Sequence, residues 1–413
     1  MNAPYSLWTN VLDMDYAWNE NGKIWFVGQK LQYIFCADLE KKEINAVLRL
    51  PGASVTGFRR YQQLVKCGNK LVCLPYFNKD ILIYNLNDCS VNNILIPDCE
   101  EVTEMCCSCA GIVKNKLYIV AGWNIKKILV LDIEEEILKI FDIDCSDINE
   151  MIGTRSAIYI GKIYIPVWNK EKVISFDINT YEFKEHLISG DICGCASIYQ
   201  DGKNCWVIGR NYGIIKWVPD TDEFTEVWNF PTQFKLFSVD EMGEMVDWYA
   251  YVEKRVYDPS SMNMFCWEGI CRNHHLYILP CFSDSIVQIN TDTMQIRFFQ
   301  FGTEDQKEIN QNHVGASAFS LWGCDSDENM YIVSRQDYKI YCIDKKNMSG
   351  SSDDWIISEE TIHRLLTDLL DEKKIERKSV LLETFIYGVK KECIKEKKDR
   401  ANNKVGAQIY YRI

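Results

Sequence analysis

One unit of sequence recurs seven times along most of this chain. In each copy an apolar run that contains an aromatic position leads through a short loop to a second apolar run, which ends in Asp or Asn. The unit is clearest at residues 115–123 with 128–132, and at residues 161–168 with 173–177. Two such runs predict an antiparallel strand pair, because Asp or Asn at the end of the second run suits a tight turn.

The seven copies align on two positions. The aromatic position falls at Trp25, Val72, Tyr118, Tyr164, Trp206, Tyr277 and Tyr331. The partner position follows 13 or 14 residues later in six copies, at Asp38, Asn85, Asp132, Asp177, Asn290 and Asp344. Only the fifth copy breaks the pattern, with Val218-Pro219-Asp220. Scattered hydrophobicity does not produce this spacing, so the copies are repeats of one structural unit.

Each copy provides four strands, because a further strand precedes each pair and another follows it, as residues 156–160 and 182–187 do for the fourth copy. A four-stranded unit of roughly 45 residues has the length of one propeller blade, and several blades must pack around an axis to bury their faces. We expect the aromatic residues to lie between neighbouring blades. The sequence therefore predicts an all-β fold, a β-propeller of seven blades rather than six or eight.

The predicted propeller covers residues 1–357 and is followed by a helical tail over 358–413. The predicted blades span residues 13–52, 57–99, 105–146, 152–190, 193–231, 263–302 and 313–357. An insertion over 233–263, acidic and aromatic, separates blades five and six, and insertions of this kind often shape a binding lip. Ring closure is expected to use both 354–357, as the outer strand of the last blade, and the N-terminal segment 6–11.

After Trp355 the apolar period changes from two to between three and four, which is typical of helices. Ser358 is placed to cap a helix, with Glu359 and Glu360 in its first turn and Ile357 able to pack on Ile362. A second helix is expected from Ser379. We expect these helices to fold back onto the propeller, and the alternative is that they dock a partner.

Charge and composition limit the class of protein. The net charge is −13, and residues 358–413 hold 13 Lys and Arg against 10 Asp and Glu, which leaves about −16 on the rest. An acidic body argues against nucleic acid as the main partner. The N-terminus does not resemble a signal peptide, and no apolar stretch reaches the length of a membrane span. We expect a cytoplasmic protein whose 18 cysteines are mostly reduced and buried.

The repeat resembles that of the kelch-like propellers, whose blades carry a Lys-apolar-Tyr-apolar-Val strand, a Gly-Gly pair and a later Asp. The resemblance covers residues 13–357 and is degenerate, since only Ala121-Gly122 approaches the double glycine. WD40 signatures and the Ser-x-Asp-x-Gly-x-x-Trp box of sialidases are absent from the sequence. Kelch-like propellers include enzymes and binding modules, so the resemblance implies the fold rather than an activity.

Candidate site residues follow from their place in a blade. In a propeller, the starts of the innermost strands and the loops between the second and third strands lie on one face, around the channel mouth. The strand starts offer Arg59, Arg60, Arg155 and His313, and the loops offer Tyr76, Phe77, Trp123, Asn124, Trp168, Asn169, Arg210 and Phe282. Aromatic rings beside amides suit peptide side chains and sugars. The alternative is that these aromatic residues are repeat positions that only pack.

The sequence contains no motif of a metal site, a cofactor site or a known catalytic site. Cys107 and Cys109 lack the spacing of a zinc site, so we expect no metal, and no motif calls for a cofactor. The sequence favours a non-enzymatic recognition or scaffold propeller of bacterial type, which binds a protein, a peptide or a glycan. The alternative is a lyase or epimerase in which arginines grip a carboxylate or sugar and His313 or Arg155 takes part in catalysis.

Overall fold

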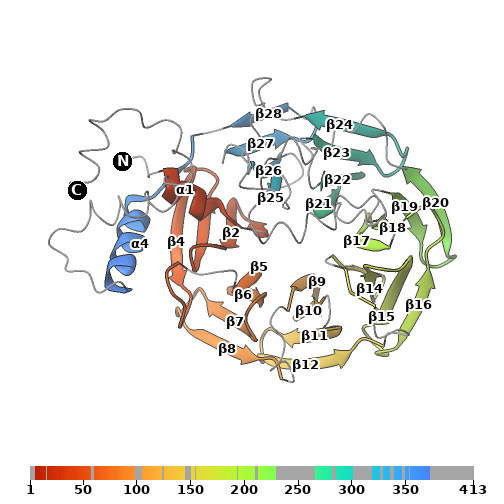
Figure 1. Ribbon diagram of the computed structural model, residues 1–413, viewed down its shortest axis with the longest axis horizontal. Helices are drawn as coiled ribbons and strands as arrows, with labels where there is room; N and C mark the ends of the chain where they lie inside the picture. Colours follow the sequence, from red (N-terminus) through yellow and green to blue (C-terminus); the bar gives the residue numbers. More distant parts are fainter. Residues whose placement is uncertain are drawn as a thin grey trace, which may run out of the picture.

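The described residues form seven sheets arranged as the blades of a propeller, each with four antiparallel strands (Figure 1). The structure is a computed structural model that describes residues 5–14, 16–56, 60–97, 105–122, 125–144, 150–153, 155–192, 194–209, 213–228, 266–280, 285–300, 319–325, 329–334, 339–346, 349–352 and 354–372. The seven-bladed prediction is confirmed.

Each blade runs outward from the axis in the order of its strands. Blade 1 contains β1 (Ala17–Glu20), β2 (Lys23–Val27), β3 (Tyr33–Asp38) and β4 (Glu43–Arg49). Blade 2 contains β5 (Tyr61–Cys67), β6 (Lys70–Pro75), β7 (Asp80–Asn85) and β8 (Val91–Leu95). Blade 3 contains β9 (Cys107–Val113), β10 (Lys116–Ala121), β11 (Lys127–Asp132) and β12 (Ile137–Asp142). Blade 4 contains β13 (Ala157–Tyr159), β14 (Lys162–Val167), β15 (Lys172–Asp177) and β16 (Phe183–Leu187).

The remaining three blades follow the same order. Blade 5 contains β17 (Cys195–Gln200), β18 (Cys205–Gly209), β19 (Ile214–Val218) and β20 (Glu223–Trp228). Blade 6 contains β21 (Cys266–Arg272), β22 (His275–Pro280), β23 (Ser285–Asn290) and β24 (Ile296–Gln300). Blade 7 contains β25 (Phe319–Asp325), β26 (Asn329–Ser334), β27 (Ile340–Asp344) and β28 (Ser349–Ser352).

The recurring aromatic position lies on the second strand of every blade and faces the next blade. Tyr164 of blade 4, for example, packs edge-on against Trp217 of blade 5 with ring centroids 5.2 Å apart. Trp206 of blade 5 likewise shares a core cluster with Leu276 and Ile278 of blade 6. The core is therefore a ring of clusters between blades, as the sequence predicts.

The partner position makes the same turn in six blades. The side-chain Oδ1 of Asp177, at the end of β15, accepts bonds from the amides of Asn179 and Thr180 at 2.9 and 3.1 Å. Equivalent bonds to Oδ1 occur at Asp38, Asn85, Asp132, Asn290 and Asp344. This local bond explains why only Asp or Asn recurs there.

Ring closure differs from the prediction. Residues 356–357 form β29 (Ile356–Ile357), which pairs in parallel with β4 of blade 1 instead of completing blade 7. The N-terminal segment forms helix α1 (Tyr5–Leu12) rather than a strand. Both segments still close the ring, because Leu7, Val11 and Ile357 share one core cluster with blade 1 and with Val333 and Ile340 of blade 7. Buried apolar contact, not a shared sheet, therefore joins the first and last blades.

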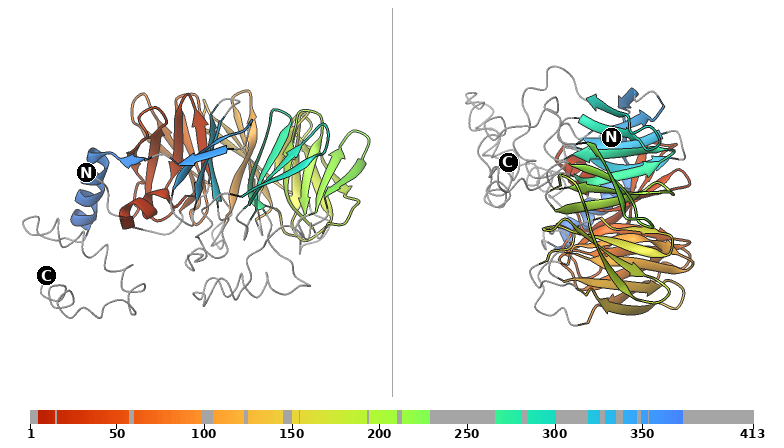
Figure 2. Two further views of the ribbon diagram at one scale, coloured as in Figure 1. Left: turned by 90° about the horizontal axis from the view of Figure 1, so that it is seen from above. Right: turned by 90° about the vertical axis from the view of Figure 1, so that its right-hand side faces the viewer.

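The tail helix begins where its capping pattern predicts. Helix α4 (Glu359–Glu372) follows Ser358, whose Oγ accepts the Thr361 amide at 3.2 Å. Leu365 is fully buried against blade 1. Figures 1 and 2 show α4 at the outer edge of the ring, beside β4. This helix folds back onto the propeller.

Two predicted features lie outside the described residues: the insertion over 233–263 and the second tail helix from Ser379. Among the helices that are described, none is long and apolar enough to cross a membrane.

Candidate functional site on the loop face

The innermost strands begin on the same face of the propeller as the loops between second and third strands, because neighbouring strands are antiparallel. In blade 2, Tyr61 at the start of β5 pairs with Pro75 at the end of β6, and residues 76–79 continue into the loop before β7. We call this side of the propeller the loop face. The side-chain turns at the ends of the third strands lie on the opposite face.

Half of the predicted site residues can be placed. The structure describes Arg60, Tyr76, Phe77, Arg155, Trp168 and Asn169. Arg59, Trp123, Asn124, Arg210, Phe282 and His313 lie outside the described residues.

The loop of blade 2 presents an aromatic residue to solvent. Phe77 is 40% exposed, whereas Tyr76 beside it is only 7% exposed. Their rings meet edge-on with centroids 4.6 Å apart, so the buried tyrosine supports the exposed phenylalanine. A supported, exposed aromatic ring is a typical anchor for a binding partner.

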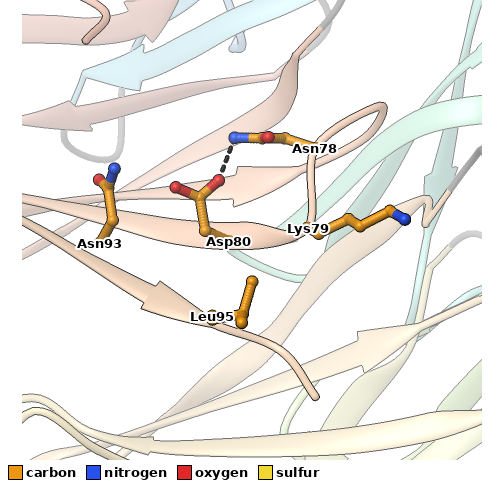
Figure 3. Close-up of a pocket in the computed structure, with 5 residues that line it drawn as sticks. All are labelled: Asn78, Lys79, Asp80, Asn93 and Leu95. Atoms are coloured by element: carbon orange, nitrogen blue, oxygen red, sulfur yellow. Dashed lines mark hydrogen bonds between the residues drawn. The ribbon is translucent and has the colours of Figure 1, made fainter. Parts of the chain in front are cut away.

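A pocket of about 300 Å³ opens next to this loop, lined by Asn78, Lys79, Asp80, Asn93 and Leu95 (Figure 3). Asn78 and Lys79 belong to the loop, Asp80 starts β7, and Asn93 and Leu95 lie on the outer strand β8. Asp80 and Leu95 are direct partners in the β7–β8 register. The sequence predicted Tyr76 and Phe77 of this loop as site residues but not Asp80, Asn93 or Leu95. These strand residues come together only through the pairing of β7 with β8, which the sequence alone does not reveal.

A buried tyrosine holds the polar side of the pocket in place. The Tyr61 hydroxyl donates to Asp80 Oδ1 at 3.1 Å and accepts from Asn78 Nδ2 at 2.7 Å, while Asn78 Nδ2 also donates to Asp80 Oδ1. Burial, and then the Asp80 charge, raise the pKa of Tyr61 far above its usual value. The hydroxyl therefore stays protonated and keeps donating, so the Asp80 carboxylate is positioned before any ligand arrives.

Arg60 contacts the connection between blades 1 and 2 and the ring of Tyr61. Its Nη1 donates to the Pro51 carbonyl at 2.8 Å, and its guanidinium carbon lies 5.8 Å from the Tyr61 ring centroid. Arg60 thus fixes the connection between blades 1 and 2 beside the pocket.

Arg155 instead crosses the axis of the propeller. It precedes β13 of blade 4, yet its guanidinium carbon lies 4.5 Å from the ring centroid of Tyr16, which precedes β1 of blade 1. The backbone of Arg155 forms an isolated β-bridge with Ser197 of blade 5, and the backbone of Tyr16 forms one with Gln63 of blade 2. Arg60 and Arg155 thus contact different residues.

Trp168 and Asn169 tie their loop to the segment that leads into blade 4. The Trp168 amide donates to the Met151 carbonyl at 2.6 Å, and Asn169 Oδ1 accepts the Met151 amide at 2.9 Å. Asn169 therefore has a structural role in this loop.

Of the two cysteines at the start of blade 3, Cys107 is buried and Cys109 is half-buried. Burial raises the pKa of Cys109 to about 12, although Arg155 opposes this, and Cys107 packs inside the cluster between blades 2 and 3. Within the described ranges, no three His, Cys, Asp or Glu side chains gather as metal ligands would.

A serine, a histidine and an aspartate line up elsewhere, between blades 4 and 5. Ser175 Oγ lies 3.0 Å from His186 Nε2, and His186 Nδ1 lies 3.1 Å from Asp222 Oδ1. The order of contacts matches a hydrolytic triad, but Ser175 and His186 are only 3% and 5% exposed. The His186 ring is also covered by Trp217 and Tyr164, so the pair is closed to a substrate. This network joins two blades and was not foreseen from the sequence.

Comparison with solved structures shows the same fold in proteins of very different sequence. Virginiamycin B lyase from Staphylococcus aureus aligns at 11% identity and a TM-score of 0.55, over 82% of this chain and 95% of that one. A streptogramin B lyase aligns at 13% identity and a TM-score of 0.55, over 85% and 96%. The Cps50 (Swd1) β-propeller domain of Myceliophteria thermophila aligns at 10% identity and a TM-score of 0.52, over 80% and 97%.

These similarities show the fold alone. No protein-family model matches the chain, and no curated protein sequence matches it either. The kelch-like assignment therefore stays a prediction.

Proposed function

We propose that this propeller is a non-enzymatic recognition module that binds a protein or a peptide on its loop face. The observation that carries the proposal is Phe77, exposed and supported by Tyr76, in the same loop as two residues of a pocket with a positioned carboxylate.

The surface around this pocket has the composition of an interface. Phe77 and Leu95 are 40% and 69% exposed, so apolar surface flanks a polar centre. Aromatic anchors beside positioned polar groups supply most of the binding energy in protein interfaces. Because Tyr76 supports Phe77 and Tyr61 positions Asp80, these groups need little reorganisation on binding, which favours affinity.

Selection of linear peptides from a random library tests the proposal. Peptides that bind the full-length protein are expected to lose at least about tenfold in affinity to Phe77→Ser, because an anchor ring is removed. Phe298→Ser is the matched control, since Phe298 is 39% exposed but lies on the outer strand of blade 6. Failure to select any peptide, or equal loss in both variants, would contradict the proposal.

The alternative is a propeller enzyme of the lyase or epimerase type, acting on a sugar or small carboxylate. The position of Arg155 on the axis favours it, because an arginine there can grip a carboxylate. In that case the protein should turn over a sugar or a small carboxylate, and Arg155→Gln should abolish that turnover.

A further inference from the structure

We infer that the blade 2 pocket binds the cationic side chain of a peptide, an arginine or a lysine. This inference rests on the proposed recognition function and specifies the chemistry of its partner.

The one negative charge of the pocket lining is the Asp80 carboxylate, which has a fixed orientation. The bonds that Asp80 accepts from Tyr61 and Asn78 both fall on Oδ1. Figure 3 shows the second oxygen of Asp80 on the side of Asn93, away from Asn78. A carboxylate oxygen presented in this way suits an ammonium or guanidinium donor, because charge-assisted hydrogen bonds are the strong ones.

Lys79 also lines the pocket, and Figure 3 shows its amine extending away from Asp80. A cation that binds Asp80 in this pocket is then the partner's.

The apolar wall fits the stem of a long basic side chain. Leu95 lies directly across from Asp80 in the sheet, so a methylene chain can pack on it while its charged end reaches the carboxylate. The described residues that line the pocket include no aromatic ring, which a sugar would use for stacking. The lining thus favours a basic side chain over a glycan.

The charge of the whole molecule acts in the same direction. The protein carries −13 at neutral pH, so its field attracts cationic partners and speeds their association.

Calorimetric titration of the full-length protein with N-acetyl-arginine amide tests the inference. N-acetyl-citrulline amide, a neutral compound of nearly the same shape, and N-acetylglucosamine are the comparison ligands. We expect the arginine compound to bind at least about tenfold more tightly than either one, because only it forms a charge-assisted pair.

Two substitutions in the pocket give opposite expectations. Asp80→Asn keeps an oxygen for Tyr61 and Asn78 but removes the charge, so arginine binding should weaken about tenfold. Asn93→Asp adds a carboxylate at an exposed position and should strengthen binding. Asp142→Asn is the matched control, because it changes the net charge equally at a carboxylate that is 84% exposed on blade 3.

The outcomes separate this inference from the proposed function. Equal binding of the citrulline compound, preferred binding of the sugar, no binding of the arginine compound, or equal effects of Asp80→Asn and Asp142→Asn would overturn the inference. Selected peptides that depend on Phe77 but contain no basic residue would overturn it too, while leaving the recognition function in place. Arginine binding that Asp80→Asn removes supports it, even where no peptide is selected.

Discussion

His186 Nδ1 lies 3.1 Å from Asp222 Oδ1, although the two residues belong to different blades. Asp222 sits in the turn after β19, which is the one turn where the recurring Asp or Asn is missing. Asp222 Oδ1 also lies 3.2 Å from Trp217 Nε1, which donates to it. The turn of blade 5 thus lacks the side-chain bond of the other six turns, and Asp222 links it both to Trp217 of its own blade and to His186 of blade 4.

The burial of His186 predicts a loss of stability in mild acid. Burial, only partly offset by Asp222, lowers the pKa of His186 from its usual 6.5, while Lys184 and Lys162 lower it further. The unfolded chain therefore binds a proton more readily than the folded one, and stability present above pH 6.5 falls as the pH drops below that value. Urea unfolding of the wild type and His186→Gln from pH 7.5 to 5.5 should show a difference in unfolding free energy that shrinks with acid. A constant difference would contradict this.

The buried lysine of blade 4 predicts a large effect from a single substitution. Lys172 Nζ contacts Glu150 Oε1 at 2.6 Å, and their side chains are 4% and 3% exposed. Lys172→Met leaves Glu150 buried without this cation and should cost about 3–5 kcal/mol of unfolding free energy. The double variant with Glu150→Gln should recover much of that loss.

The control for this pair is the surface pair of Lys127 with Asp142, whose carboxylate is 84% exposed. Lys127→Met should change the unfolding free energy by no more than about 1 kcal/mol. Similar losses at Lys172 and Lys127 would show that burial is not the cause.

A close approach between blades 4 and 5 makes Gly153 intolerant of substitution. A Cβ atom there would lie 2.6 Å from the Ala196 carbonyl oxygen and 2.8 Å from Pro166 Cγ. Gly153→Ala should therefore destabilise the protein by about 1–3 kcal/mol in urea unfolding. Gly111→Ala, whose nearest atom is the flexible end of Ile158 at 3.0 Å, should cost less. The reverse order would contradict this account.

The blades could be predicted because their signals are local. An aromatic residue such as Tyr164 and its partner Asp177 lie in one hairpin, so their spacing is visible in the sequence. The helix start at Ser358 is local as well, since its cap bond spans three residues.

The rest depends on contacts between distant blades, for which a single sequence has no pattern. Arg155 meets Tyr16 only because blades 1 and 4 face each other across the axis. Asp80 and Leu95 meet through strand register, and two residues of β29 pair in parallel with β4 without any periodic signal. The position of Phe77 on the loop face could be predicted from its place in the repeat. The pocket beside its loop could not.

The docking of α4 gives the last prediction, because its side chains bind the edge of β4 where β29 ends. Thr361 Oγ1 accepts the Ala46 amide at 2.8 Å, and Arg364 donates to the carbonyls of Ala46 and Val47 at 3.2 and 3.1 Å. Thr361→Val keeps the shape of the side chain but leaves that amide without its acceptor, so unfolding free energy should fall by about 1–3 kcal/mol. Thr367 on the same helix makes an exposed contact of 3.5 Å with His363 Nδ1, so Thr367→Val should stay within about 0.5 kcal/mol of the wild type. Equal unfolding curves for both variants would mean that the helix is held by Leu365 and its apolar neighbours alone.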